Sequence, residues 1–308
     1  MRRIGAATWL RIMVTLAAIG TLVFIADWPA FLSILRRIPL QAVVLAFFFG
    51  GLTHALLGAR WHVIAGPTIP GGFWFHLGVY WRASVLGLLT PGSLGTDAYR
   101  ILAMGSPSSS RATITGLVVR ERFVGLSGYL LSYLAALPFV SDPNGVFTAL
   151  ALPVALLLIL LLTAWRLAAT ASPLVEKYLP ARFAQVAGRI SAGLRAASGG
   201  GLVYSFALTF GACATWFALV YVIATGLAPG VSFAFSALSA VLAELVRIVP
   251  LSVQGVGVRE SAFGYAFHAG GSSLEVGVAT GILAYVIYNL VVGMGGVAMS
   301  FAGQRKAT

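Results

Sequence analysis

The chain has 308 residues, of which 59% are hydrophobic and only 9% charged, with 20 Lys and Arg against 8 Asp and Glu. A soluble domain carries about a quarter of its residues as charged side chains, so a soluble enzyme, a disordered chain and a secreted disulfide scaffold are excluded. The net charge of +12 is scattered between apolar runs, which favours membrane topology and anionic headgroups over nucleic acid. We therefore expect an all-α polytopic membrane protein without a nucleic-acid partner.

Apolar runs of about 20 residues, enough to cross about 30 Å of hydrocarbon, predict the spanning helices. The six clear ones are about 9–26, 40–58, 123–140, 146–168, 202–226 and 277–302. The first follows Arg2 and Arg3 as a signal peptide would, but no A-x-A cleavage pattern follows it. Residues 27–29 (Asp-Trp-Pro) close it like a membrane interface. We interpret it as a retained anchor.

Two further apolar regions, 73–105 and 232–268, are each interrupted by a Pro/Gly/Ser stretch that an acid–base pair follows. The first break is at 90–95 and is followed by Asp97 and Arg100. The second break is at 250–257 and is followed by Arg259 and Glu260. Each region thus has the form of a helix, a break and a second short helix. The second halves are short and polar, which favours re-entrant hairpins; two full crossings per region remain the alternative.

The distribution of Lys and Arg orients these elements. Loop 169–201 is basic and is expected in the cytoplasm with both termini, whereas loops 141–145 and 227–231 carry no basic residue and are expected outside. Arg36 and Arg37 fit an outside loop only if an interfacial helix holds them.

With this orientation the first broken region starts and ends inside, and the second starts and ends outside. Hairpins that enter from opposite faces are typical of the inverted repeats of transporters. We therefore expect one transmembrane domain over 1–308, with repeat 1 at about 40–140 and repeat 2 at about 202–302.

The connector at about 169–201 contains a stretch, 173–198, with apolar residues at helical spacing. They are Leu179, Phe183, Val186, Ile190 and Leu194. Basic residues lie between them, which predicts an amphipathic helix on anionic lipids of the inner leaflet. A solvated connector is the alternative.

Charged residues gather at expected membrane depth, where each costs about 2.5–3.5 kcal/mol on insertion scales. They are Arg82, Asp97, Arg100, Arg120, Glu121, Arg122, Glu244, Arg247, Arg259 and Glu260. The spacing of three places Asp97 with Arg100 on one helical face, and Glu244 with Arg247 on another. Mutual neutralisation is one explanation. Pairs that stand beside a helix break favour a binding site instead.

The breaks themselves predict a cavity, because lipid cannot satisfy backbone groups that leave helical geometry. The residues expected to line it are Pro91, Gly92, Ser93, Gly95, Pro250, Ser252, Gly255 and Gly257. Helices restarting near Gly95 and Gly257 would present N–H groups to a phosphate, and Arg100, Arg122 and Arg259 would add two-donor contacts. We expect no metal and no cofactor, because the histidines are isolated and Cys213 is the one cysteine.

At these motifs the sequence resembles the lysylphosphatidylglycerol synthase transmembrane-region family. The residues that carry the resemblance are Thr-Pro-Gly-Ser-Leu-Gly-Thr-Asp-Ala-Tyr-Arg at 90–100, Glu121-Arg122-x-x-Gly125, Pro-Leu-Ser at 250–252, and Gly255-x-Gly257-x-Arg259-Glu260. The family includes the flippase portion of the multiple peptide resistance factor and many stand-alone proteins. Ser93 and Thr96 stand where the family often has glycine, and Glu121 where it often has aspartate.

The resemblance implies a multi-pass protein of the cytoplasmic membrane of a prokaryote that moves or helps to handle a lipid with a polar head, whether a phospholipid, a hopanoid or a polyprenyl-linked lipid. The breaks and arginines add the expectation that this headgroup carries a phosphate. Asp97, Glu121 and Glu260 would position the arginines or carry a coupling proton. The aminoacyl-transfer domain of full-length synthases is not expected, so we expect a flippase-like transporter rather than an enzyme. An integral-membrane enzyme acting on a lipid phosphate and an accessory subunit of a lipid-synthesis complex remain alternatives, as does a homo-oligomer.

Overall fold

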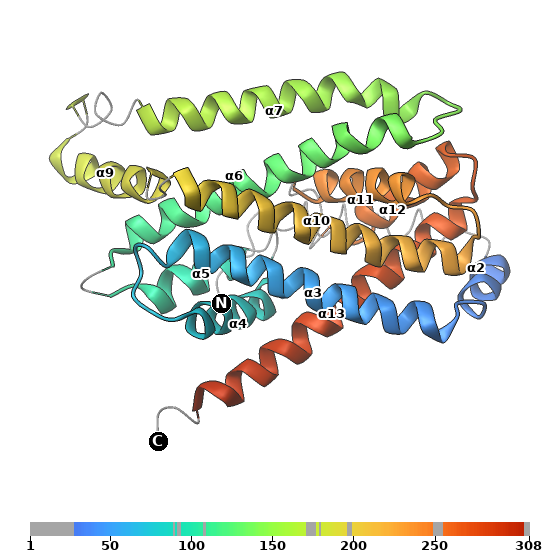
Figure 1. The fold of residues 1–308 in the computed structure, drawn as a ribbon, viewed down its shortest axis with the longest axis horizontal. Coiled ribbons are helices and arrows are strands. Elements are labelled where there is room, and N and C mark those ends of the chain that lie inside the picture. The colour runs from blue at the N-terminus through green and yellow to red at the C-terminus, as the bar shows by residue number, and fades with distance from the viewer. Residues whose placement is uncertain are drawn as a thin grey trace, which may run out of the picture.

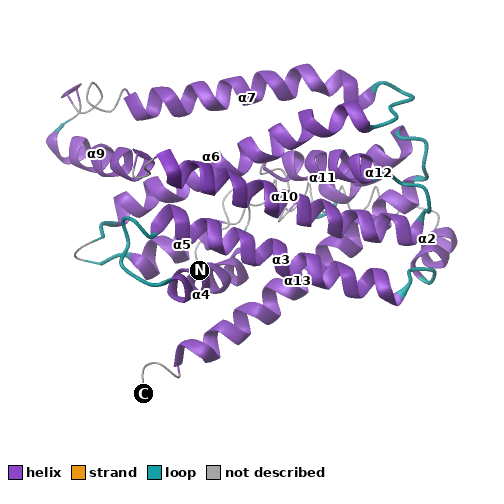
Figure 2. Ribbon diagram, viewed as in Figure 1, coloured by secondary structure: helices purple, strands orange, loops and turns teal. Residues whose placement is uncertain are grey.

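The computed structural model describes residues 28–88, 90, 94–106, 109–170, 177–178, 180–195, 199–248 and 255–304. All regular elements in these ranges are helices (Figure 2), as the composition and apolar runs predict. In chain order they are α2 (Trp28–Leu35), α3 (Leu40–Ala65), α4 (Phe73–Leu88), α5 (Leu94–Met104), α6 (Arg111–Ala136), the 3-10 helix η2 (Leu137–Phe139), α7 (Val146–Thr170), α9 (Ala181–Arg195), α10 (Gly199–Leu227), α11 (Phe233–Ile248), α12 (Val258–Ala269) and α13 (Leu274–Gln304).

Four helices, α3, α7, α10 and α13, are long and apolar enough to cross a membrane. They contain the predicted spans 40–58, 146–168, 202–226 and 277–302 and extend beyond them at one or both ends. The predicted span 9–26 lies outside the described residues. The structure thus supports four of the six predicted spans.

The predicted span 123–140 belongs to α6, which differs from the prediction at both ends. The helix begins at Arg111 because the Ser110 hydroxyl caps it, accepting a hydrogen bond from the Thr113 N–H at 3.1 Å. It ends at Ala136 and passes into η2. Helix α6 is long enough to cross a membrane, but it is not among the four apolar helices because its first half carries charged residues.

Helices α3 and α10 lie side by side at the centre of the molecule (Figure 1). Gly50 of α3 faces Leu219, and Gly226 of α10 faces Ala42, so the residue numbers fall along one helix as they rise along the other. The two helices are therefore antiparallel. The absent Cβ atoms at these glycines let the backbones approach closely.

The short helices α4 and α11 pack on long helices that are distant from them in sequence. Helix α4 packs against α13, and α11 packs against α6. The short pair α4–α5 lies toward the end of the molecule where α9 is found, and the short pair α11–α12 toward the end where α2 is found (Figure 1). Each short pair thus packs on the long helix that follows it in sequence and also on a long helix from the other side of the connector.

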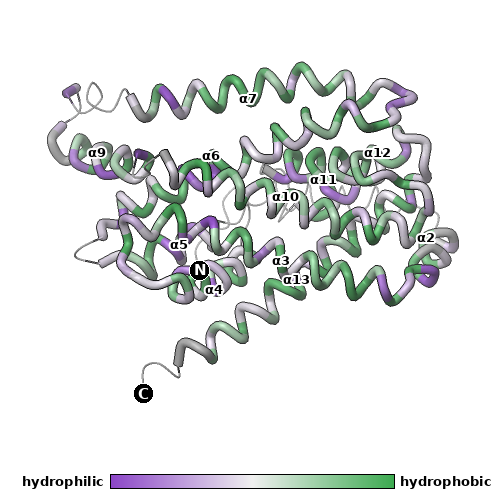
Figure 3. Tube along the Cα trace, in the orientation of Figure 1, coloured by the Kyte–Doolittle hydropathy of each residue, from purple (hydrophilic) through white to green (hydrophobic). Residues whose placement is uncertain are grey.

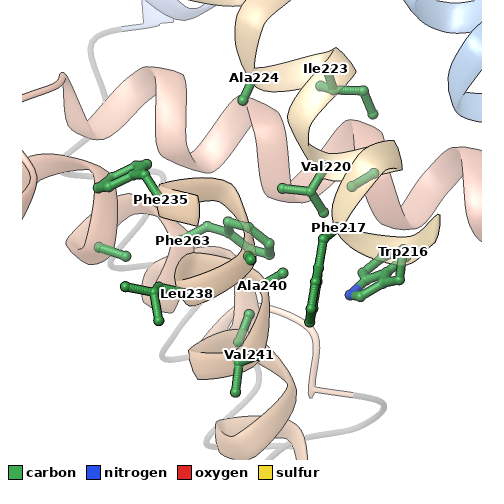
Figure 4. Close-up of a cluster of buried hydrophobic side chains, with 14 of the residues drawn as sticks. Trp216, Phe217, Val220, Ile223, Ala224, Phe235, Leu238, Ala240, Val241 and Phe263 are labelled. Atoms are coloured by element: carbon green, nitrogen blue, oxygen red, sulfur yellow. The ribbon is translucent and has the colours of Figure 1, made fainter. Parts of the chain in front are cut away.

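The largest hydrophobic core is formed around α10, α11, α12 and α13. Figure 4 shows Phe217 and Val220 of α10 meeting Ala240 and Val241 of α11, with Phe263 of α12 beside them. Phe263 is completely buried. This core fixes the second short pair of helices against the central α10.

Helix α7 lies along the outside of the bundle and is hydrophobic over most of its length (Figure 3). Most of its leucine and isoleucine side chains are exposed, as expected for a surface that faces lipid. Its start is fixed to the bundle, because the Tyr133 hydroxyl of α6 donates a hydrogen bond to the carbonyl of Phe147 at 2.7 Å.

The predicted amphipathic helix is confirmed as α9 for Ala181–Arg195, whereas Leu179 lies outside the described residues. The predicted apolar face of α9 is exposed at one end and buried at the other. Phe183 and Val186 are exposed, whereas Leu194 is buried. Near Leu194 the helix packs on α6, where the backbones of Gly193 and Gly116 are in direct contact. The connector is therefore partly integrated into the bundle rather than wholly solvated.

Candidate functional site

Both predicted breaks interrupt a helix. In the first, α4 ends at Leu88 and α5 begins at Leu94, and the Thr90 hydroxyl accepts a hydrogen bond from the Gly95 N–H at 2.7 Å. In the second, α11 ends at Ile248 and α12 begins at Val258 after Gly257, which has φ +82°, a conformation that favours glycine. The other predicted break residues Pro91, Gly92, Ser93, Pro250 and Ser252 lie outside the described residues, and Gly255 is described and buried.

The first charge network consists of Arg60, Asp97, Arg100, Glu121 and Arg122. Arg100 Nη2 donates to Asp97 Oδ1 at 2.7 Å, and Arg100 also forms an ion pair with Glu121. Arg60 donates to the other oxygen of Glu121 at 3.1 Å. Arg122 binds Asp97 Oδ2 through two nitrogens, at 2.7 and 3.2 Å. Helices α3, α5 and α6 thus join through a continuous chain of alternating charges.

Burial divides this network into an inner and an outer part. The Arg100 side chain is 3% exposed and that of Glu121 4%, whereas 48% of the Arg122 side chain is exposed. The Arg100 guanidinium also lies over the Trp61 ring, 4.3 Å from its centroid, a cation–π arrangement that orients it. Three arginines are paired with two carboxylates, so the network has one positive charge in excess. Its exposed cation is Arg122.

The second charge network consists of Glu244, Arg247, Arg259, Glu260 and Tyr285. Arg247 binds Glu244 Oε2 at 2.6 and 2.9 Å, and the Tyr285 hydroxyl donates to the other Glu244 oxygen. Arg259 donates to Glu260 Oε1 at 2.7 and 3.1 Å and lies 3.3 Å from the Tyr285 ring centroid. Here two positive charges balance two negative charges, and Arg247 is the most exposed ion-pair member, at 31% of its side chain.

At each break, one N–H group near the start of the new helix is bound by a side chain of the protein itself. Glu260 Oε2 accepts the Gly257 N–H at 2.7 Å, and the Gly95 N–H is bound to Thr90. These two N–H groups, which the sequence predicts would face a phosphate, are therefore already paired. The partly exposed side chains of Arg122 and Arg247 are further groups able to bind an anion near the breaks.

The two networks approach each other across the middle of the molecule. The Tyr288 hydroxyl lies 3.0 Å from Nδ1 of His54. The His54 ring also contacts Tyr80, over which Arg100 lies, and the Tyr288 ring contacts Trp216, which in turn contacts Tyr285 of the second network. A row of aromatic side chains thus connects the two charge networks.

The predicted site residues Asp97, Arg100, Glu121 and Arg122 come together, and Arg259 and Glu260 form a second group. Sequence reasoning missed Arg60 and Tyr285, which complete the two networks. In the sequence, Arg60 is a single charged residue directly after the predicted span 40–58, and nothing in the spacing indicates its partner Glu121.

The prediction that the histidines are isolated is wrong for His62 and His76, whose Nδ1 atoms are 2.7 Å apart. Among the described residues no group of three or more His, Cys, Asp or Glu could hold a metal ion.

The family model described as the lysylphosphatidylglycerol synthase TM region matches residues 9–296. The chain belongs to this family. The match confirms the resemblance seen in the three motifs, and it covers both breaks and both charge networks. A search among curated proteins found no match.

Membership in the lysylphosphatidylglycerol synthase TM region family agrees with the four apolar helices. Together they identify a multi-pass helical membrane protein. The family also indicates a lipid-related function.

Proposed function

We propose that this protein is a flippase-like lipid transporter of the cytoplasmic membrane of a prokaryote, rather than an enzyme. Its substrate is a lipid with a polar, phosphate-bearing headgroup. The observation that carries the proposal is the surplus cation of the first charge network. Arg122 is held by Asp97, yet 48% of its side chain is exposed, so its guanidinium can exchange part of this pairing for a phosphate.

The lengths of the short helices support re-entrant hairpins. Helices α4 and α11 have 16 residues each, and α5 and α12 have 11 and 12. At 1.5 Å per residue these lengths are about 24 and about 17 Å, below the roughly 30 Å of a hydrocarbon core. Two such hairpins directed from opposite ends would meet near the middle of the bilayer, as in inverted-repeat transporters.

Within this proposal the side chains have different roles. Arg122 contacts the headgroup in the first network and Arg247, the exposed cation of the second, contacts it in the other hairpin. Arg100, Glu121 and Glu260 are held in buried ion pairs and act as positioning residues. Arg259 is held over Tyr285 and would bind a headgroup only if the second network rearranged.

The test measures redistribution of a fluorescent anionic phospholipid between leaflets of proteoliposomes that contain Arg122→Gln. We expect a rate about tenfold or more below wild type, since a hydrogen bond to a charged group contributes about 1.5–3 kcal/mol. The melting temperature should stay close to wild type, because exposed ion pairs contribute at most about 1 kcal/mol. Arg122→Lys should also transport poorly, because an ammonium lacks the planar two-donor geometry.

The matched control is Arg111→Gln, an exposed arginine on the same helix that takes no part in either network. A well-folded Arg122→Gln protein that transports at the wild-type rate would contradict the assigned site. New lipid products in the same vesicles would instead favour an enzyme acting on a lipid phosphate. A purified wild-type protein that moves no lipid until a co-purifying partner is added would favour an accessory subunit.

A further inference from the structure

Arg120 differs from the other buried arginines. Only 1% of its surface is exposed, and Nε, Nη1 and Nη2 find no hydrogen-bond acceptor among the described residues. By contrast, Arg60, Arg100 and Arg259 each bind a carboxylate. Because a guanidinium stays protonated in proteins, Arg120 is a buried charge without a counter-charge, which is unfavourable.

The position of Arg120 on α6 indicates which helices pack on its side of α6. Arg120 follows Gly116 by one helical turn, so both lie on one face of α6. Gly116 contacts the carbonyl of Ile190 and the Cα of Gly193, both in α9. Further along the helix, Gly128 contacts Thr209 of α10. Arg120 therefore lies where α9, and next α10, pack onto α6, whereas its neighbour Glu121 binds arginines of α3 and α5.

The helices on this side of α6 contain no acidic residue. The sequence has no Asp or Glu from residue 177 to residue 243, a range that includes the whole of α9 and α10. Instead α9 carries Arg182, Arg189 and Arg195. Helix α10 begins with Gly199-Gly200-Gly201, and the first N–H groups of a helix lack partners within it and carry partial positive charge. None of the described helices on this side of α6 therefore offers Arg120 a carboxylate, and an anion from outside the chain can supply the counter-charge.

We infer that Arg120 is the centre of a binding site for a phosphate-type anion at the junction of α6, α9 and α10, separate from both charge networks. The planar guanidinium matches the geometry of a phosphate with two parallel donors. The source is the phosphodiester of an anionic lipid, since α9 exposes Phe183 and Val186 beside its arginines, the pattern of a helix at a lipid surface. Because Arg120 is covered, α9 shifts from α6 to admit the phosphate. Free phosphate shares this chemistry, and the experiment separates the two sources.

The experiment uses the full chain in a non-ionic detergent, freed of lipid, and measures its melting temperature on addition of phosphatidylglycerol, phosphatidylcholine or inorganic phosphate. We expect phosphatidylglycerol to raise the melting temperature of the wild type, because a ligand that binds the folded state stabilises it. Arg120→Gln should lose this response, with an apparent affinity about tenfold or more weaker. Arg111→Gln, which replaces an exposed arginine of the same helix, should keep it.

The lipid-free proteins give a second readout. Without lipid, Arg120→Gln should melt at or above the wild-type temperature, because the substitution removes an unpaired buried charge. A response of the wild type to inorganic phosphate equal to that for phosphatidylglycerol would assign the site to the free anion. A response to phosphatidylglycerol alone would assign it to the lipid.

Three results would overturn the site: an unchanged phosphatidylglycerol response in Arg120→Gln, no response of the wild type to any of the three additives, or failure of lipid-free Arg120→Gln to fold. Native mass spectrometry gives an independent measure. The wild type should retain phosphatidylglycerol, and Arg120→Gln should retain about tenfold less. Equal retention by the two proteins would contradict the proposal. None of these readouts depends on lipid transport.

Discussion

At the scale of single residues, Glu121 holds the first charge network together. Its two oxygens bind Arg60 of α3 and Arg100 of α5, while its own backbone belongs to α6. All three side chains are at most 8% exposed. A neutral side chain at this position would leave two buried arginines short of a counter-charge, whereas loss of Arg122 would affect only the exposed end.

Glu121→Gln should therefore lower the stability of the protein by about 3–5 kcal/mol, the usual cost of removing one partner from a buried ion pair. Arg122→Gln should cost about 1 kcal/mol or less. Thermal unfolding in detergent, followed by tryptophan fluorescence, measures both. Equal melting temperatures for the two variants would show that burial does not divide the network as described.

The sequence predicted the local part of this site and missed the part that depends on folding. The spacing of three correctly paired Asp97 with Arg100 and Glu244 with Arg247, because such residues share a face of one helix. Contacts between helices, such as Arg60 with Glu121, depend on how the helices pack, and no spacing rule encodes them. For the same reason the unpaired state of Arg120 appeared only in the folded structure.

At the scale of elements, glycines decide how closely the short helices approach the long ones. A Cβ atom at Gly295 of α13 would overlap the ring of Trp81 on α4, and one at Gly296 would overlap Val85. At Gly293, on the same helix, a Cβ would meet nothing within 4 Å. The contact between α4 and α13 thus depends on glycine at particular positions rather than throughout α13.

Gly295→Ala should destabilise the protein, because Trp81 is buried and its ring must move to admit the methyl group. Gly293→Ala should be neutral or stabilising by up to about 1 kcal/mol, since alanine favours the helix more than glycine does. Melting temperatures of the two variants provide the comparison. Similar values for both would mean that α4 does not pack on α13 as closely as described.

The start of α7 should be sensitive to acid through Asp142, which lies in the loop before it. Burial opposes ionisation of this carboxyl, but hydrogen bonds from the backbone N–H of Thr148 and the two residues before it outweigh burial and lower its pKa. A lowered pKa in the folded state contributes stability that is present above the ordinary value of about 3.9. That stability is lost as the pH falls through the folded-state pKa.

Asp142→Asn should therefore melt below the wild type at pH 7, and the difference should shrink as the pH falls below about 4. The measurement is the difference in melting temperature between the two proteins at each pH, which cancels the titration of other carboxyls. A difference that does not change with pH would show that the Asp142 charge does not stabilise α7.

At the scale of the whole molecule, the described loops outside the two breaks lie at two ends (Figure 1). The 3-10 turn and the loop before α7 lie near the end of α12, because the Asn144 side chain donates a hydrogen bond to the carbonyl of Ala269 at 2.7 Å. Helix α9 lies at the opposite end (Figure 1). This separation agrees with the orientation expected from the basic residues, in which loop 169–201 faces the cytoplasm.

Single cysteines introduced into a Cys213→Ser background test this orientation. Cysteines at Asn144 and Pro229 should react with a membrane-impermeant maleimide in intact cells, and one at Arg189 should react only after lysis. All three positions are exposed, so a missing reaction reflects the membrane rather than burial. Labelling at Arg189 in intact cells would reverse the assigned sides.

The antiparallel contact between α3 and α10 has a consequence for how the gene can be divided. Helix α3 precedes the connector and α10 follows it, yet each makes its most extensive helix–helix contact with the other. Packing between α3 and α10 therefore holds the part of the chain before the connector to the part after it, independently of the covalent link at 171–176. A gene cut at that link would encode two complementary polypeptides, each incomplete alone, that reassemble in the bilayer through α3 and α10.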